Sequence, residues 1–387
     1  MSLSRFSPKY EADWSKLGLI GLILIVTALL LRLLFLYTSL TNLPVTSDEA
    51  SSVLLAKMIA RGELPLLFIG QPYQFPIESY LMAPFVEWMP RSPLGARYQG
   101  LILSTIAFGG FLLIIRTAFL DGARWPALLL ICFPSAYFLI YQAAYAPPQY
   151  SISLTLAWVS IFAVLRSRQS SRASIYLAVA GLSCGLAVSN HLLTITISAG
   201  VFALVLCSGS FRKSFWGSVL FTVCCLIGAL PYILVILFVP GAYHNLPISM
   251  KLIDAMTRMI VPGLSITLPG AMGVNPIVFP DLGGYLDWSS SLPSLFAILY
   301  GILFISLSIQ RIIIFSTDLL SRKWPRFELV DLALISSLLT LWVFASHLTS
   351  SSFYRYMLPA VWCFPFLVGH AFTSFTGRFR TFVGAAA

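Results

Sequence analysis

Ten apolar runs constrain this chain more than any other feature of its sequence. Each run approaches or exceeds the roughly 20 residues that a helix needs to cross a bilayer. They lie near residues 17–38, 97–116, 125–142, 149–165, 174–190, 192–210, 216–239, 293–314, 328–347 and 356–374. Charged residues make up only 10% of the chain, whereas a soluble domain carries about 25%. The sequence therefore predicts an all-α polytopic membrane protein, a bundle of about ten transmembrane helices that forms one domain over residues 1–387, with no separate soluble domain.

The distribution of basic residues predicts the orientation of this bundle. A net charge of +10 could indicate a nucleic-acid partner. The basic residues, however, lie in short loops between apolar runs, as Arg166, Arg168 and Arg172 do, and this pattern reports membrane topology. The positive-inside rule places these loops and both termini in the cytoplasm, which leaves two large loops outside, at about 40–96 and about 240–292. We therefore expect an integral protein of a bacterial inner membrane, with no nucleic-acid partner.

The first outer loop is predicted to hold two short helices. Residues 48–60 carry apolar side chains at helical spacing and end at Arg61-Gly62, a typical helix stop. Residues 77–88 are expected to form a second helix that lies on the membrane surface, as amphipathic segments flanked by Tyr and Trp do. The second outer loop is rich in proline and glycine, so we expect mostly irregular structure with a few short helices there.

Four carboxylates follow the first apolar run closely: Asp48, Glu49, Glu63 and Glu78. Loops that are held by a rigid scaffold are where functional sites concentrate, so these acids are candidates for chemistry. A carboxylate can accept a proton from an attacking hydroxyl, and it can also bind a divalent cation. The spacing alone leaves a second interpretation open, in which Asp48 only caps the helix that begins there.

A set of short motifs, in order along the chain, resembles the GT-C superfamily of membrane glycosyltransferases. The chain is most similar to the bacterial branch related to protein O-mannosyltransferases and lipid A aminoarabinose transferases. The motifs are Arg32 near the outer end of the first span, "DEA" from Asp48, the helix ending in "RG" at Arg61, "GQPYQFPIESYLMAP" from Gly70, "GLSCGLAVSNHLL" from Gly181 and "RYMLP" from Arg355. Each motif is weak alone, but the ordered set with its matching topology is fairly specific.

The resemblance implies both a fold and a reaction. It implies a GT-C-like bundle that transfers a sugar from a polyprenyl-phosphate sugar to a lipid, glycan or protein acceptor at the outer face, usually with inversion. The catalytic role falls on Asp48, with Glu49 as the adjacent acid. Some relatives use a divalent metal at this acid, so Mg²⁺ or Mn²⁺ bound by Asp48 is a possible cofactor. Many relatives carry a further soluble domain, and here the second outer loop is expected to take its place.

Several other residues are candidates for substrate binding. A guanidinium forks onto phosphate oxygens, so Arg355 is expected to hold the leaving phosphate, with an interfacial anchor as the alternative role. An acid beside aromatic rings suits a sugar, which points to Glu78 with its neighbours Tyr73 and Tyr80. The remaining candidates are Lys57, Arg61, Arg32 and His191, each of which also has a purely structural interpretation.

Three other functions remain open at this point. A transporter or flippase of lipid-linked sugars would favour acids at the bilayer midplane and inverted repeats, neither of which is evident here. An O-antigen ligase or polymerase also has many spans and a large outer loop, but is not marked by "DEA" directly after the first span. A catalytically silent relative that acts as a subunit is the third. The expected partners of the leading hypothesis are the lipid-linked sugar donor, membrane lipids and the acceptor.

Overall fold

Helices dominate the computed structural model. It describes residues 18–42, 47–69, 74–88, 94–118, 124–132, 149–207, 211–238, 268, 291–321, 324, 327–347 and 357–386. The helices are α1 (Gly18–Asn42), α2 (Ser47–Ala60), α3 (Ile77–Trp88), α4 (Leu94–Ala118), α5 (Arg124–Cys132), α7 (Gln149–Ser167), α8 (Ala173–Asn190), the 3₁₀ helix η4 (Leu192–Thr194), α9 (Ile195–Leu206), α10 (Phe211–Gly228), α11 (Leu230–Phe238), α14 (Ser291–Leu320), α15 (Leu329–His347) and α16 (Leu358–Ala386).

The predicted apolar runs correspond to these helices. Within the described residues, α4, α7, α8 and α14 are each long and apolar enough to cross a membrane. The pair α10 and α11 forms a fifth candidate span that bends by 56° at its break. Shorter apolar stretches lie in α1, α9, α15 and α16. The prediction of an all-α polytopic membrane protein is confirmed, whereas the second half of the run at 125–142 and nearly all of the loop at 240–292 lie outside the described residues.

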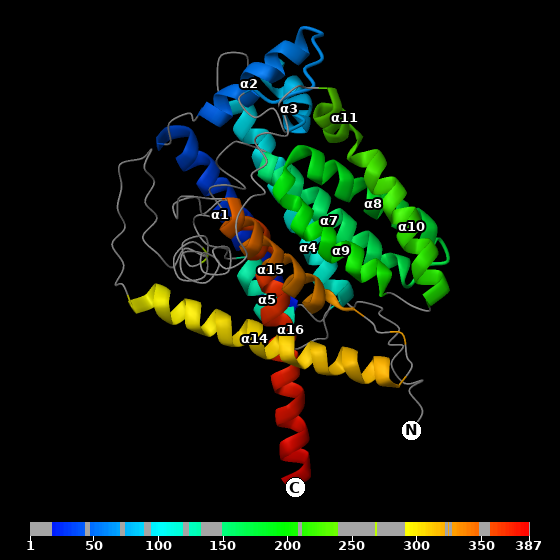
Figure 1. Cartoon of the computed structure of the whole chain (residues 1–387). Coiled ribbons are helices and arrows are strands. Elements are labelled where there is room, and N and C mark those ends of the chain that lie inside the picture. Colours follow the sequence, from blue (N-terminus) through cyan, green and yellow to red (C-terminus); the bar gives the residue numbers. More distant parts are fainter. Residues whose placement is uncertain are drawn as a thin grey trace.

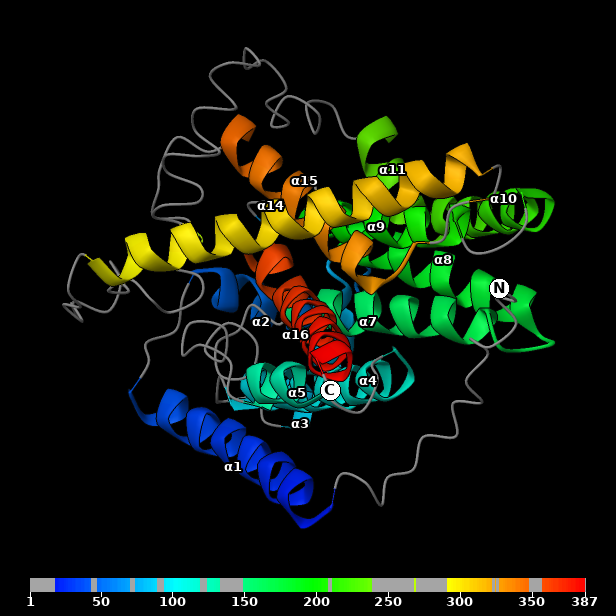
Figure 2. The ribbon, with the colours of Figure 1, turned by 90° about the horizontal axis from the view of Figure 1, so that it is seen from below.

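The bundle has two distinct ends (Figure 1). Helices α2 and α3 lie together at one end, and the C-terminal part of α16 extends from the opposite end. Seen from that opposite end, α14 crosses over α15, and the C-terminal part of α16 points toward the viewer (Figure 2). Arg311 of α14 donates to both carboxylate oxygens of Asp331 in α15, each at 2.7 Å, so a two-point ion pair joins these helices.

At the end of the bundle opposite α2 and α3, two side chains donate hydrogen bonds to the last carbonyls of α9. The last carbonyls of a helix have no partner within the helix itself. Here Arg168 donates to the carbonyl of Leu204 at 2.9 Å, and the indole nitrogen of Trp324 donates to that of Leu206 at 3.1 Å. Arg168 also reaches the carbonyl of Phe327 at 3.0 Å, which ties the segment before α15 to the α7–α8 connection.

The short helices at the other end follow the predicted bounds closely. α2 begins at Ser47, and it ends where Gly62 adopts a left-handed conformation with φ of 88°. The backbone nitrogen of Glu63 donates to the carbonyl of Met58 at 3.1 Å, a bond that closes the helix end. α3 spans the predicted residues 77–88. The two helices share a small apolar cluster of Ala56, Met82 and Val86.

Glycines allow α8 and α10 to pack with their backbones in contact. A methyl group added to Gly185 would meet the carbonyl oxygen of Cys225, and it would lie 2.6 Å from the backbone nitrogen of Ala229. Gly181 and Gly228 show the same close approach from the two helices. This contact explains the glycines of the "GLSCGLAVSNHLL" stretch, because only a residue without a side chain fits there.

We predict that Gly185→Ala destabilises the protein by about 1–3 kcal/mol, since the new methyl group collides with backbone atoms that have no freedom to move away. The measurement is the midpoint of thermal unfolding in detergent. Gly109→Ala is the matched control, because a methyl group there meets open space. Equal midpoints for the two variants would show that α8 and α10 are not packed as described.

Candidate functional site

A buried ion pair fixes the first turn of α2 to α4. Glu49 follows Asp48 in that turn, and its side chain has no exposed surface. The Nε atom of Arg97 lies 2.7 Å from Oε1 of Glu49, and Nη2 lies 2.9 Å from Oε2. The Arg97 side chain is 1% exposed. Two parallel bonds of this kind define both distance and orientation, so the pair sets the position of the helix that carries Asp48.

Sequence reasoning missed Arg97. The residue stands at the start of an apolar run, where it reads as one more charge beside the membrane. Its partner lies 48 positions earlier, so no local spacing connects the two. One signal was present: Arg97 lies on the side predicted to be poor in basic residues and rich in acids.

Glu78 is a buried carboxylate in the first turn of α3. It is 1% exposed, and neither carboxylate oxygen has a hydrogen-bond partner among the described residues. Burial raises the pKa of Glu78 to about 8, because an ion without a partner is unfavourable in a medium of low polarity. The carboxyl group therefore carries a proton in most molecules at neutral pH. Contact with a sugar, predicted from the sequence, stays a prediction.

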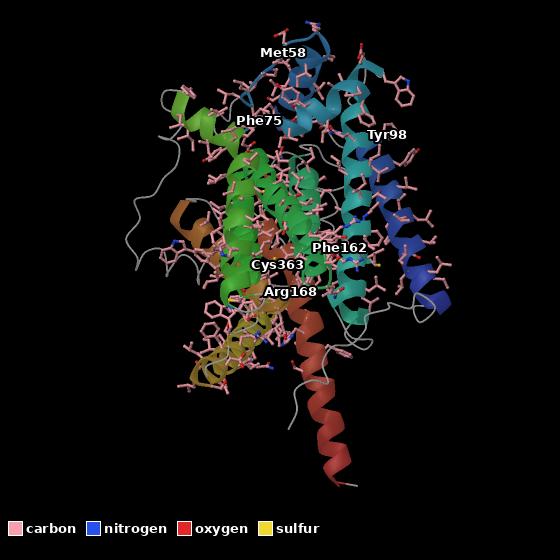
Figure 3. The ribbon with its side chains drawn as sticks, turned by 90° about the vertical axis from the view of Figure 1, so that its right-hand side faces the viewer. Met58, Phe75, Tyr98, Phe162, Arg168 and Cys363 are labelled. Atoms are coloured by element: carbon pink, nitrogen blue, oxygen red, sulfur yellow. The ribbon has the colours of Figure 1, made fainter. Side chains whose placement is uncertain are left out.

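Tyr80 and Phe75 connect the first loop to the bundle. The Tyr80 hydroxyl donates to the carbonyl of Pro65 at 2.9 Å, and its ring stacks on Phe75 with centroids 5.6 Å apart. The backbone nitrogen of Phe75 donates to the carbonyl of Ser189 at 2.9 Å, in the last turn of α8. Figure 3 shows Phe75 at the end of the bundle that α2 and α3 occupy. The residues directly before α3 are therefore packed against the bundle.

His191 lies directly after α8 at this same end. It is 5% exposed, and its Nδ1 atom accepts a hydrogen bond from the backbone nitrogen of Leu193 at 3.3 Å. Its ring lies 4.9 Å from that of Tyr150 in the first turn of α7. Both rings line a narrow crevice together with Trp362 and with Leu358, the first residue of α16. This crevice brings residues of α7 and α16 together with the turn that follows α8.

The other basic candidates are spread over different surroundings. Arg32 is 2% exposed within α1, where its guanidinium lies 4.4 Å from the ring centre of Phe108 and donates to the carbonyl of Ala28 at 3.1 Å. Lys57 is half-buried on α2, and Arg61 is exposed directly after it. Tyr73, Arg355 and the side chain of Asp48 lie outside the described residues.

Comparison with solved structures places this arrangement in a known fold. No protein-family model and no curated protein matches the sequence. ArnT from Cupriavidus metallidurans superposes on 91% of the chain, with a TM-score of 0.55 and 15% identity, and its structure bound to undecaprenyl phosphate matches with a TM-score of 0.54. The archaeal oligosaccharyltransferase AglB from Archaeoglobus fulgidus, in complex with an inhibitory peptide and a dolichol-phosphate, covers 97% with a TM-score of 0.50 and 16% identity.

The chain shares the fold of ArnT and AglB. The resemblance that the sequence motifs indicated is therefore confirmed at the level of the fold. The chain spans 60% of the length of ArnT and 52% of the length of AglB, so the shared fold extends over only that part of each protein.

The metal requirement of this GT-C bundle stays a prediction. Among the described residues, no group of three or more His, Cys, Asp or Glu side chains could hold a metal ion. An AglB structure from Archaeoglobus fulgidus contains zinc and sulfate. Any metal held through Asp48 would involve a side chain outside the described part of this chain.

We predict that Arg97→Leu destabilises the protein by about 3–5 kcal/mol, because it leaves the Glu49 charge buried without its partner. Glu49→Leu combined with Arg97→Leu should recover most of that loss, since neither charge is then buried. Unfolding midpoints and hydrogen exchange of residues 47–60 measure the effect. Arg61→Gln, at an exposed site, is the control. If Arg97→Leu is as stable as Arg61→Gln, the pair has no structural role.

We predict that stability falls as pH rises, because of Glu78. The pKa of Glu78 is about 8 in the folded state against an ordinary value of 4.5, so the folded state favours the protonated form. Its contribution is therefore fully present below pH 4.5 and is lost as pH rises through about 8. Unfolding midpoints in a choline-based buffer should decline over this range for the wild type and less for Glu78→Gln. Glu87→Gln, at an exposed position of the same helix, should behave as the wild type does.

Proposed function

We propose that this chain is a membrane glycosyltransferase that takes a sugar from a polyprenyl-phosphate sugar and transfers it to an acceptor hydroxyl. The observation that carries the proposal is the GT-C fold combined with the position of "DEA". Asp48 stands in the first turn of α2, directly after the first apolar helix, and the neighbouring ion pair of Glu49 with Arg97 holds that turn in place. A catalytic group needs such support, since small displacements cost large factors in rate.

The reaction that we propose is a single displacement. The acceptor oxygen attacks the anomeric carbon of the sugar, the bond from that carbon to the phosphate oxygen breaks, and Asp48 accepts the hydroxyl proton. The released polyprenyl phosphate gains negative charge, which a guanidinium can stabilise by forked hydrogen bonds. We assign that task to Arg355, with Lys57 and Arg61 as further cations near α2. A single displacement inverts the anomeric configuration.

The lipid-linked donor is supported by the two neighbouring folds. One ArnT structure holds undecaprenyl phosphate and one AglB structure holds dolichol-phosphate. Both ligands are long isoprenoid phosphates, so the same class of carrier suits this chain. The acceptor is a lipid, glycan or protein, and the second outer loop at 240–292 is the segment we propose for its recognition.

The charge distribution supports a site on the outer face. Arg166 lies in the last turn of α7, and Arg168 and Arg172 follow in the connection to α8, at the end of the bundle away from the contact of Ser189 with Phe75. Under the positive-inside rule this basic end faces the cytoplasm. Helices α2 and α3 then face the periplasm of a bacterial inner membrane, and the C-terminal end of α16 lies in the cytoplasm.

We predict that Asp48→Asn lowers the rate of transfer by about 10²–10⁴-fold, the contribution expected of a general base, because the amide accepts no proton from the acceptor. The measurement is release of polyprenyl phosphate by purified protein from a panel of polyprenyl-phosphate sugars, with and without chelator. The chelator arm decides the metal requirement.

Glu63→Gln is the matched control for this experiment, because Glu63 is an exposed acid in the same loop. This variant should release polyprenyl phosphate as fast as the wild type does. If the wild type binds donors but releases no polyprenyl phosphate with any of them, the transferase proposal fails, and a transporter or a silent subunit takes its place.

A further inference from the structure

A group of buried oxygen atoms lies without partners around the first turn of α3. They are the two carboxylate oxygens of Glu78, the hydroxyl of Ser79 and the side-chain carbonyl oxygens of Gln74 and Gln99, none of which has a hydrogen-bond partner among the described residues. All four side chains expose 2% of their surface or less. Buried polar atoms are nearly always satisfied, because leaving one unpaired is costly. Five such atoms on four residues around the start of α3 and in α4 indicate a polar ligand that these residues do not supply to one another.

Backbone and side-chain contacts hold these four residues in one unit. The amide nitrogen of Gln99, in α4, donates to the backbone carbonyl of Glu78 at 3.1 Å. Ser79 is the next residue of α3, and its backbone nitrogen donates to the carbonyl of Pro76 at 3.0 Å. Gln74 stands two residues before Pro76, and its backbone carbonyl accepts from the backbone nitrogen of Phe68 at 3.0 Å.

The chemistry of these atoms points to a cation. Carboxylate, amide and hydroxyl oxygens are the ligands that hard cations prefer. All four side chains are buried, so a ligand of these oxygens must be small, as a bare ion is. The single negative charge decides the valence: a monovalent ion with ionised Glu78 is neutral, whereas a divalent ion would leave a net positive charge buried.

The surroundings do not alter this charge count. Helices α2, α4 and α7 pack against α3. On α2 and α4, Glu49 and Arg97 neutralise each other, and Lys57 is half-buried. On α7, Tyr150 is the titratable group at the near end, where its ring lies beside that of His191. Glu87, on α3 itself, is exposed.

We propose that Glu78, Ser79, Gln74 and Gln99 form a binding site for a small monovalent cation such as Na⁺, and that a proton on Glu78 occupies the site in its place. Binding of the cation to the protonated site releases that proton, so the charge of the site does not change. Either occupant joins α3 to α4 and to the segment around Gln74. The proposal is independent of sugar transfer, because its readouts are stability and protection of α3.

The test compares sodium with choline at matched ionic strength and two pH values. At pH 8.5, NaCl should raise the unfolding midpoint of the wild type by about 3 °C or more with saturation, as expected for a ligand of the folded state. It should also slow hydrogen exchange of residues 77–88. At pH 5.5 the proton fills the site, so sodium should have little effect beyond that of choline.

Variants separate this site from general effects of salt. Glu78→Gln should lose the sodium response at pH 8.5, Gln99→Leu should weaken it, and Glu87→Gln should keep it. If Glu78→Gln does not fold, binding of ²²Na⁺ to the wild type at pH 8.5 and not at pH 5.5 decides the question. An equal effect of potassium would support a monovalent site without selectivity. An equal effect of choline, or a sodium response that survives in Glu78→Gln, would overturn the proposal.

Discussion

The end of the bundle that carries α2 and α3 depends on one buried ion pair. α2 has 14 residues, and an isolated helix of that length is marginal in water, so its position must come from contacts with the rest of the fold. Glu49 and Arg97 supply a contact that tolerates no sliding, because any shift along α4 separates two charges in a medium of low polarity. Such a pair adds little net stability over apolar packing, but it selects one register.

Two buried carboxylates of the same loop are accommodated in different ways. The guanidinium of Arg97 contacts the carboxylate of Glu49 at two points. Glu78 faces no such group among the described residues, and burial raises its pKa to about 8. A proton or a monovalent cation then supplies the missing positive charge. The two acids therefore have different tasks: one fixes the geometry beside Asp48, and the other makes the packing of α3 depend on the ions around it.

The parts of this fold that follow from local chemistry could be predicted from the sequence. The stop of α2 at Gly62 and the extent of α3 were expected, because a left-handed glycine and a short amphipathic stretch are local signals. The partner of Glu49 was not expected, because Arg97 lies far away in sequence. The bond from the Tyr80 hydroxyl to the carbonyl of Pro65 was not expected either, because no spacing rule reveals it. The need for glycine at Gly185 could not be predicted either, because it arises from the backbone of α10 that packs against this residue.

Ser189 links the two regions that lead into the proposed outer loops. Its carbonyl accepts from the backbone nitrogen of Phe75, just before α3, and its hydroxyl donates to the carbonyl of Gly228 at 3.1 Å, where α10 ends. The chain bends by 56° at that point and continues through α11 toward residues 240–292. The close glycine contact of α8 with α10 holds Ser189 against this bend. The packed pair of α8 and α10 therefore fixes the start of α11 relative to α3, and α3 is in turn packed against α2. The proposed transfer requires a donor and an acceptor at one carboxylate at a set distance, and this series of contacts ties the start of α11 to the helix that carries Asp48.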